Sequence, residues 1–91
     1  MTVRVKFFAY FREVFGGRER DLELAPGDTV ADALDRLADT PARRRELLDG
    51  AALKPHLVVM INGAPVGSLR GAATPLSPGD TLAVFPLVGG G

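Results

Sequence analysis

Only one segment of the sequence has the length and the pattern of a full amphipathic helix, and this limits the folds that the chain can adopt. It covers residues 26–40 (PGDTVADALDRLADT), and either Asp28 or Thr29 can cap its start. Four apolar residues recur at the i, i+3, i+4 and i+7 spacing of one helical stripe: Val30, Ala33, Leu34 and Leu37. One main helix covers one face of a sheet, so we expect the other face to remain partly open.

A second, shorter helix is predicted over residues 41–50 (PARRRELLDG). Thr40 precedes it as an N-cap residue, Pro41 suits its first position, and Gly50 suits the position after its end. We expect its run of three arginines, residues 43–45, to lie on a solvated helix face, although such a run can also bind an acidic partner.

The other regular segments have the period-two pattern of strands. In residues 2–9 (TVRVKFFA), Val3, Val5 and Phe7 share one face, while Arg4, Lys6 and Phe8 share the other. A short helical turn is predicted over residues 10–17, and further strands over residues 18–25, 56–61, 64–66 and 81–85. Strands and helices do not alternate regularly along the chain, and this order is typical of the α+β class.

Two phenylalanines are predicted on the open face of the sheet. Leu82 and Val84 share the face of the last strand that suits contact with the helix, which places Phe85 on the opposite face. Burial of Phe7 turns Phe8 outward in the same way. An apolar patch of this kind on a small domain indicates a partner-binding site, unless the short helix or a loop covers it.

Composition excludes several classes of function. The 91 residues make one domain, and their 11 basic and 11 acidic side chains cancel, which argues against a nucleic-acid partner. Without cysteine there is no disulfide, thiolate metal site or cysteine nucleophile. The one histidine, His56, suits the start of a strand rather than a metal site, and Met60 suits the core. With no signal peptide and no apolar run long enough to span a membrane, we expect a cytoplasmic protein.

The chain ends on Gly89-Gly90-Gly91, directly behind an apolar strand and Pro86. Such an end can be an inconsequential disordered tail, a cloning remnant or a functional arm. Glycine has no Cβ, so a diglycine end can enter a channel too narrow for side chains and bring its carboxylate to a partner's reactive centre. A carboxylate is a poor acyl electrophile, and an ATP-using partner can convert it to an acyl-adenylate that a sulfur nucleophile attacks.

Three segments resemble the MoaD-like sulfur carriers, the small subunits of molybdopterin synthase. They are FFAYFREVFG near the start, INGAPV in the middle and PLSPGDTLAVFPLVGGG at the end, and the resemblance covers essentially the whole chain. It implies the ubiquitin-like β-grasp fold over residues 1–86 and a flexible tail over residues 87–91. It also implies a non-catalytic carrier that binds no cofactor and no metal, and whose terminal glycine an E1-like enzyme adenylates with ATP.

The same resemblance implies the site residues and the partners. Gly91 carries the acyl-adenylate and then the thiocarboxylate, Gly90 accompanies it into the channel of the partner, and the large subunit of molybdopterin synthase receives the tail. The residues implied in partner binding are Phe8, Phe85, Pro86, Leu87, Val88 and Gly89. Leu87 and Gly89 depart from the proline and the small polar or alanine residue common in the family.

The resemblance leaves other pathways open. The segment SLRGAATPLSPGD is similar to carriers that supply sulfur for cysteine synthesis, and carriers of the thiamine pathway share the diglycine end. A ubiquitin-like modifier that forms isopeptide bonds with lysines, and a plain binding module with a loose end, also remain as alternatives.

Overall fold

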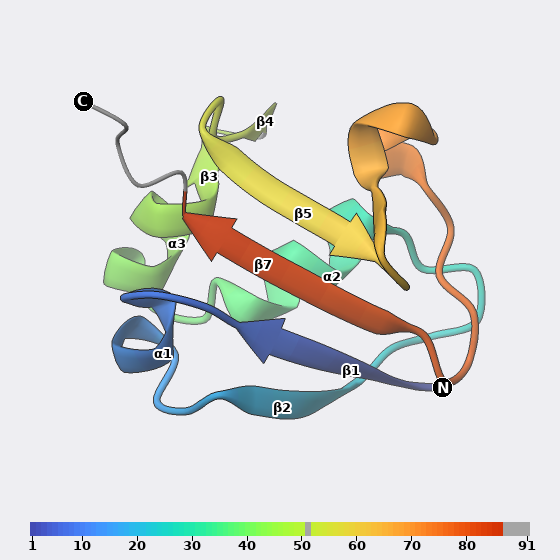
Figure 1. The fold of residues 1–91 in the computed structure, drawn as a ribbon, viewed down its shortest axis with the longest axis horizontal. Coiled ribbons are helices and arrows are strands. Elements are labelled where there is room, and N and C mark those ends of the chain that lie inside the picture. The colour runs from blue at the N-terminus through green and yellow to red at the C-terminus, as the bar shows by residue number, and fades with distance from the viewer. Residues whose placement is uncertain (51, 87–91) are drawn as a thin grey trace.

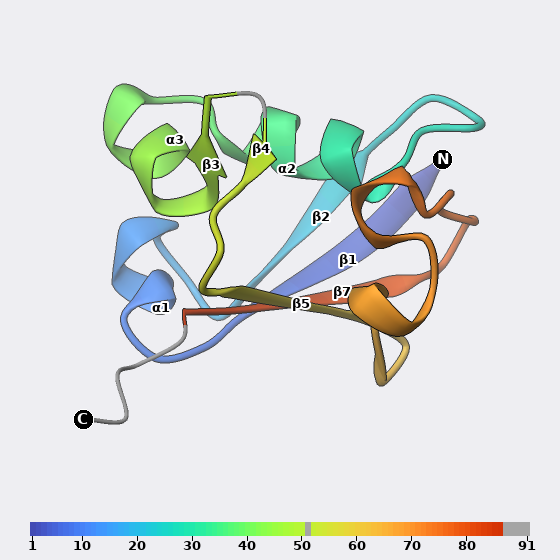
Figure 2. The same ribbon diagram turned by 90° about the horizontal axis from the view of Figure 1, so that it is seen from above.

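A mixed sheet carries the helices on one of its faces in the computed structural model of the chain, which describes residues 1–50 and 52–86 (Figures 1 and 2). The helices are α1 (Phe11–Val14), α2 (Val30–Leu37) and α3 (Pro41–Leu47), and two 3-10 turns follow, η1 (Val66–Ser68) and η2 (Gly71–Ala73). The strands are β1 (Thr2–Phe7), β2 (Glu19–Glu23), β3 (Leu48–Asp49), β4 (Ala52–Leu53), β5 (Leu57–Ile61), β6 (Ala64–Pro65) and β7 (Thr81–Pro86).

The first and last long strands lie next to each other in the centre of the sheet. The five-stranded sheet has the order β2-β1-β7-β5-β6, while β3 and β4 form a separate two-stranded hairpin. β1 and β7 are parallel, and β2 and β5 pair antiparallel on either side of them (Figure 1). The parallel register pairs Lys6 with Ala83 and Phe7 with Val84, so both strands finish at the same end of the molecule.

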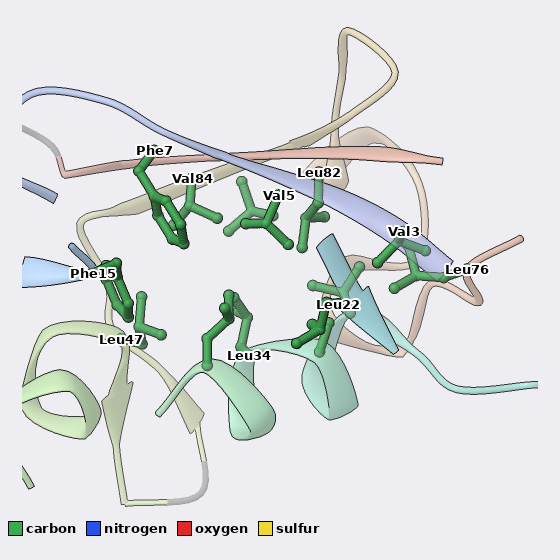
Figure 3. Packing of buried hydrophobic residues seen from close by; sticks show 14 of the residues in the cluster. Val3, Val5, Phe7, Phe15, Leu22, Leu34, Leu47, Leu76, Leu82 and Val84 are labelled. Carbon is green, nitrogen blue, oxygen red and sulfur yellow. The ribbon is translucent and has the colours of Figure 1, made fainter. Parts of the chain in front are cut away.

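The core lies between the sheet and the helices, as the alternation along the strands predicts. Phe7, Val84 and Leu82 point from the sheet toward Leu34 and the other side chains of the helical layer (Figure 3). All of the residues predicted for this face of β1 and β7, and the whole stripe of α2, are buried: Val3, Val5, Phe7, Leu82, Val84, Val30, Ala33, Leu34 and Leu37. The expected α+β arrangement with one covered face is therefore confirmed.

Local capping determines where the two predicted helices begin. Thr29 forms a capping box on α2, in which its side chain accepts a hydrogen bond from Asp32 N while its own N–H donates to Asp32 Oδ2 at 2.8 Å. Thr40 caps α3 by accepting from Arg43 N at 3.1 Å, with Pro41 in the first turn as predicted.

The predicted end of the second helix is wrong. α3 stops at Leu47 rather than continuing to Gly50, because Leu48 turns to extended backbone and begins strand β3. Gly50 instead has a φ of +64° next to this strand, where an L residue would be strained. The two-residue strands β3 and β4 are too short to produce a recognisable period in the sequence.

The placement of Met60 in the core is also wrong. Met60 alternates with the buried Val59 and Ile61, so it lies on the other face of β5, half-buried and opposite Ala83 of β7. Every residue of β5 is apolar, so no polar side chain marks which face is open. The Asn62-Gly63 turn that follows is confirmed, with positive φ values of +49° and +86°.

β7 is described as far as Pro86, and the domain boundary at residue 86 stays a prediction. The predicted tail, residues 87–91, lies outside the described residues. No helix within residues 1–50 and 52–86 is long and apolar enough to cross a membrane.

Candidate functional site

Five side chains form an apolar patch on the uncovered face of the sheet, and we call this set the outer patch: Phe8, Val58, Met60, Ala83 and Phe85. Its centre is the pair Phe8 and Phe85, whose rings are stacked with centroids 4.2 Å apart and planes 11° from parallel. Val58 lies opposite Phe85 in the adjacent strand and is 36% exposed. The two phenylalanines predicted to face outward therefore do so, and they lie together.

Backbone geometry directs Phe8 onto Phe85. Ala9 directly follows with a φ of +53°, a left-handed conformation that costs a non-glycine residue about 1–2 kcal/mol. This conformation turns the chain sharply from β1 into α1. The carbonyl groups of Phe8 and Ala9 then accept hydrogen bonds from the backbone N–H groups of Phe11 and Arg12.

Arg12 also contacts the Phe8 ring. Its Nε donates to the Phe7 carbonyl at 3.1 Å, and its guanidinium carbon lies 5.6 Å from the centre of the Phe8 ring. This is the geometry of a cation–π interaction. The arginine of the FFAYFRE segment therefore supports the outer patch rather than forming an ion pair among the described residues.

We expect the substitution Arg12→Gln to loosen the Phe8 ring without unfolding the domain. It removes a cation–π contact of about 0.5–1 kcal/mol and one hydrogen bond to a backbone carbonyl. In NMR spectra, the contacts between the Phe8 and Phe85 rings should weaken while the core resonances keep their positions. Arg45→Gln is the matched control, because Arg45 is exposed and makes no hydrogen bond or ion pair to another described side chain. Unchanged Phe8–Phe85 contacts in Arg12→Gln would contradict the role given to Arg12.

A small pocket lies at the end of β7. One of its lining residues, Pro86, directly follows Phe85 of the outer patch in the sequence. Pro86, the last residue of the strand, lines this cavity of about 150 Å³. The other lining residues come from segments far apart in the sequence: Tyr10, Phe11, Glu46, Lys54, His56 and Leu57. Two aromatic residues, a carboxylate, an amine and an imidazole therefore line the pocket at the end of β7.

Tyr10 and Glu46 are joined across this pocket. The Tyr10 hydroxyl donates to Glu46 Oε2 at 2.9 Å, which links the β1–α1 connection to α3. Partial desolvation of the phenol, together with the hydrogen bond and the charge of Glu46, raises the pKa of Tyr10 above its ordinary value. Tyr10 therefore remains a neutral donor to Glu46 at physiological pH.

The arginine run does not behave as one solvated face. Arg43 is half-buried, donates from Nε to the Val14 carbonyl at 3.0 Å and lies over the Phe15 ring, so it attaches α3 to α1. It also donates to Asp39, and this hydrogen bond lowers the pKa of the Asp39 carboxyl. Arg44 and Arg45 are exposed as predicted, and Arg44 forms an ion pair with Asp35 at 2.8 Å.

The structure describes three of the predicted site residues. Phe8 and Phe85 form the centre of the outer patch, and Pro86 is buried against the pocket. The other predicted site residues lie outside the described residues: Leu87, Val88, Gly89, Gly90 and Gly91. Within residues 1–50 and 52–86, no cluster of histidine, aspartate and glutamate side chains suits a metal ion.

Sequence comparison relates the chain to small ubiquitin-like proteins. A model of the ThiS family matches residues 5–91. Small archaeal modifier protein 3 of Haloferax volcanii is 39% identical over 92 residues, which cover 100% of both chains. Small archaeal modifier protein 1 of the same organism is 39% identical over 88 residues, covering 94% of this chain and 97% of that protein.

Comparison with solved structures finds similar proteins. The crystal structure of SAMP1 from Haloferax volcanii has a TM-score of 0.84 at 32% identity, covering 100% of each chain. A putative molybdopterin converting factor, subunit 1, from Pyrococcus furiosus has a TM-score of 0.75 at 29% identity, covering 97% of this chain and 99% of that one. CysO in the BexX/CysO complex of Amycolatopsis orientalis has a TM-score of 0.76 at 28% identity, covering 98% of this chain and 99% of that one.

These likenesses agree with the sheet order and the one-sided core, and they confirm the ubiquitin-like β-grasp fold. A family model that spans residues 5–91, with 39% identity to a relative over the whole length, shows that the chain belongs to the ThiS family.

Proposed function

We propose that the chain is a non-catalytic carrier whose Gly91 carboxylate is activated by a partner enzyme and then bears sulfur. The observation that carries this proposal is the stacked pair Phe8 and Phe85 on the uncovered face of the sheet. The outer patch adjoins the end of β7, and five residues after Pro86 the sequence ends in a diglycine. A partner docked on the outer patch is thus close to the point from which the terminal carboxylate is presented.

The chemistry requires a second protein. The carboxylate oxygen attacks the α-phosphorus of ATP, pyrophosphate leaves, and the acyl-adenylate that forms is a strong electrophile. A sulfur nucleophile then displaces AMP to give a thiocarboxylate at Gly91. The sequence has no glycine-rich phosphate-binding loop followed by lysine and serine or threonine, so ATP binding falls to an E1-like enzyme. Because activation consumes ATP, we expect the reaction to take place in the cytoplasm.

Charge around the outer patch indicates what kind of surface it fits. Lys6 lies beside Ala83, and Arg12 lies over Phe8, so cations border the aromatic centre. Arg4 is also on this face, but it is paired with Glu19 and Asp21. A partner with an apolar centre and an acidic rim would complement this arrangement. CysO, a protein of similar fold, is itself seen in a complex with BexX.

For the final sulfur acceptor we propose the molybdopterin precursor, bound to the large subunit of molybdopterin synthase. The FFAYFRE segment supports this choice, as does the likeness to the putative molybdopterin converting factor subunit of Pyrococcus furiosus. A second candidate is attachment of Gly91 to lysines of other proteins, favoured by the 39% identity to two proteins named as modifiers. Both candidates need the same activated Gly91, and isopeptide-linked products distinguish the second.

The test is capture of the thiocarboxylate on the intact chain. Incubation with the activating enzyme of the same organism, ATP and a sulfur source should give a chain that a thiol-directed alkylating agent labels once. Because the sequence has no cysteine, a label reports the terminus. Omission of ATP is the control and should give no label. A chain that stays unlabelled, with an enzyme shown to be active on another carrier, would contradict the proposal.

A further inference from the structure

An activated carboxyl can react with an amine as well as with sulfur, and the chain offers three amines. They are the α-amine of Met1 and the side chains of Lys6 and Lys54. The other basic side chains are arginines and one histidine, and the guanidinium group stays protonated and does not act as a nucleophile. The three amines lie in very different surroundings, so we expect them to differ in their reactivity toward an activated carboxyl.

Two of the three amines are poorly placed to attack an activated carboxyl. The Met1 amine donates to the Leu24 carbonyl at 2.6 Å, and the Met1 side chain is only 5% exposed. Lys6 is the next-to-last residue of β1, between β2 and β7, on the same face as the outer patch. A protein docked on the outer patch would cover Lys6.

Lys54 is exposed, and both its backbone N–H and its backbone carbonyl form hydrogen bonds. Its N–H donates to the Leu47 carbonyl at 3.0 Å, and its own carbonyl accepts from Leu57 N at 3.0 Å. The connection from β4 to β5, which contains Lys54, descends from the helical layer at the end of the sheet where β7 finishes (Figure 2). Lys54 therefore lies at the same end of the domain as the outer patch without being part of it.

The lining of the pocket at the end of β7 contains Lys54 together with two groups that can accept a proton. Glu46 and His56 line it together with Lys54, and a carboxylate or an imidazole can accept the proton that the amine loses. Glu46 is itself oriented by its hydrogen bond from Tyr10. Lys6 has no comparable setting, because the nearest acid in its register, Glu19, is paired with Arg4.

Building on the proposed activation of Gly91, we propose that Lys54 is the site at which this chain accepts the activated carboxyl of a second copy. The neutral Lys54 Nζ attacks the carbonyl carbon of the Gly91 acyl-adenylate, the C–N bond forms, and the C–O bond to AMP breaks. AMP leaves with the electron pair of that bond, and the ammonium proton passes to Glu46 or His56. The product is two chains joined by one isopeptide bond.

The experiment bypasses the activating enzyme by using a donor chain prepared with a thioester at Gly91. The donor carries K6R and K54R, so it has no lysine that can act as an acceptor. Acceptor chains with an ordinary Gly91 carboxylate are the unmodified protein, K6R, K54R and the double variant, and the double variant sets the background. We expect the unmodified chain and K6R to form the two-chain product at equal rates, and K54R to fall to the background rate.

Both lysines are exposed, so neither substitution should unfold the domain, and circular dichroism checks this. Product formation by K54R at the rate of the unmodified chain, or loss of product in K6R, would overturn the proposal. The pocket is tested by E46Q and H56A acceptors, at least one of which should react slower by roughly tenfold. Unchanged rates in both variants would contradict the role of Glu46 and His56 in the reactivity of Lys54. Since no activating enzyme is used, these outcomes are independent of the ATP-dependent capture at Gly91.

Discussion

A chain that lacks Gly90 and Gly91 should lose all ATP-dependent labelling by a thiol-directed agent and yet melt at almost the same temperature as the full chain. The loss is complete because the carboxylate that the activating enzyme requires then stands at Gly89, two residues short of its place. Stability should be retained because the described core is complete within residues 1–86 and the deleted glycines have no side chains to bury. Labelling with ATP and thermal melting measure the two effects.

A second variant separates the position of the carboxylate from the presence of the glycines. One serine added after Gly91 keeps both glycines but moves the carboxylate beyond them, and it should abolish labelling equally. A change in unfolding free energy below about 0.5 kcal/mol is expected for both variants, as for changes away from the core. A large drop in melting temperature on deletion would show that the glycines stabilise the domain and would contradict the carrier account.

Phe7→Ala should mainly destabilise the domain, whereas Phe8→Ala, at the adjacent residue, should mainly weaken the binding of a partner. Phe7 is 1% exposed and stacks on Phe15 in the core, so Phe7→Ala should cost about 3–5 kcal/mol. A domain of this size has a total stability of roughly 5–14 kcal/mol, so this variant should be largely destabilised. Phe8 is half-exposed, and Phe8→Ala should cost about 1 kcal/mol, mainly from the lost aromatic pair.

The variants of the outer patch should lose binding rather than stability. Phe8→Ala, and equally Phe85→Ala, should weaken the complex with the activating enzyme by about 2 kcal/mol or more, roughly thirtyfold in Kd, as expected for an aromatic residue at the centre of an interface. Denaturant unfolding and titration with the enzyme give the two quantities for each variant. If Phe8→Ala or Phe85→Ala unfolds the domain as Phe7→Ala does, the outer patch is a structural feature and not a docking surface.

The two faces of the sheet could be predicted where polar residues interrupt the strand pattern. Arg4 and Lys6 mark the open face of β1, so the burial of Phe7 and the exposure of Phe8 followed from alternation alone. β5 lacks such a marker, and Met60 was therefore placed on the wrong face. Caps and turns were predictable for a different reason, because Thr29, Thr40 and the Asn62-Gly63 pair act on backbone a few residues away.

Contacts between distant segments could not be predicted. Tyr10 and Glu46 are 36 residues apart, and Arg43 reaches Val14 across 29 residues, so no local pattern reports either contact. The parallel pairing of β1 with β7 is likewise a property of the folded sheet. The phenylalanines of the outer patch were predictable as single outward residues, but their stacking depends on that pairing. The pocket beside Lys54 depends on four separate segments and has no signal in the sequence.

The central claim, that sulfur is loaded onto the carboxyl of Gly91, is tested most directly by the mass of one fragment. Trypsin cleavage after Arg70 releases residues 71–91, which contain no lysine, arginine or methionine. A gain in mass therefore cannot arise from oxidation of Met1 or Met60. After incubation with the activating enzyme, ATP and a sulfur source, we predict that this fragment gains the mass of one oxygen-to-sulfur exchange, located at Gly91. A fragment of unchanged mass, beside an enzyme that loads another carrier in the same mixture, would contradict the account.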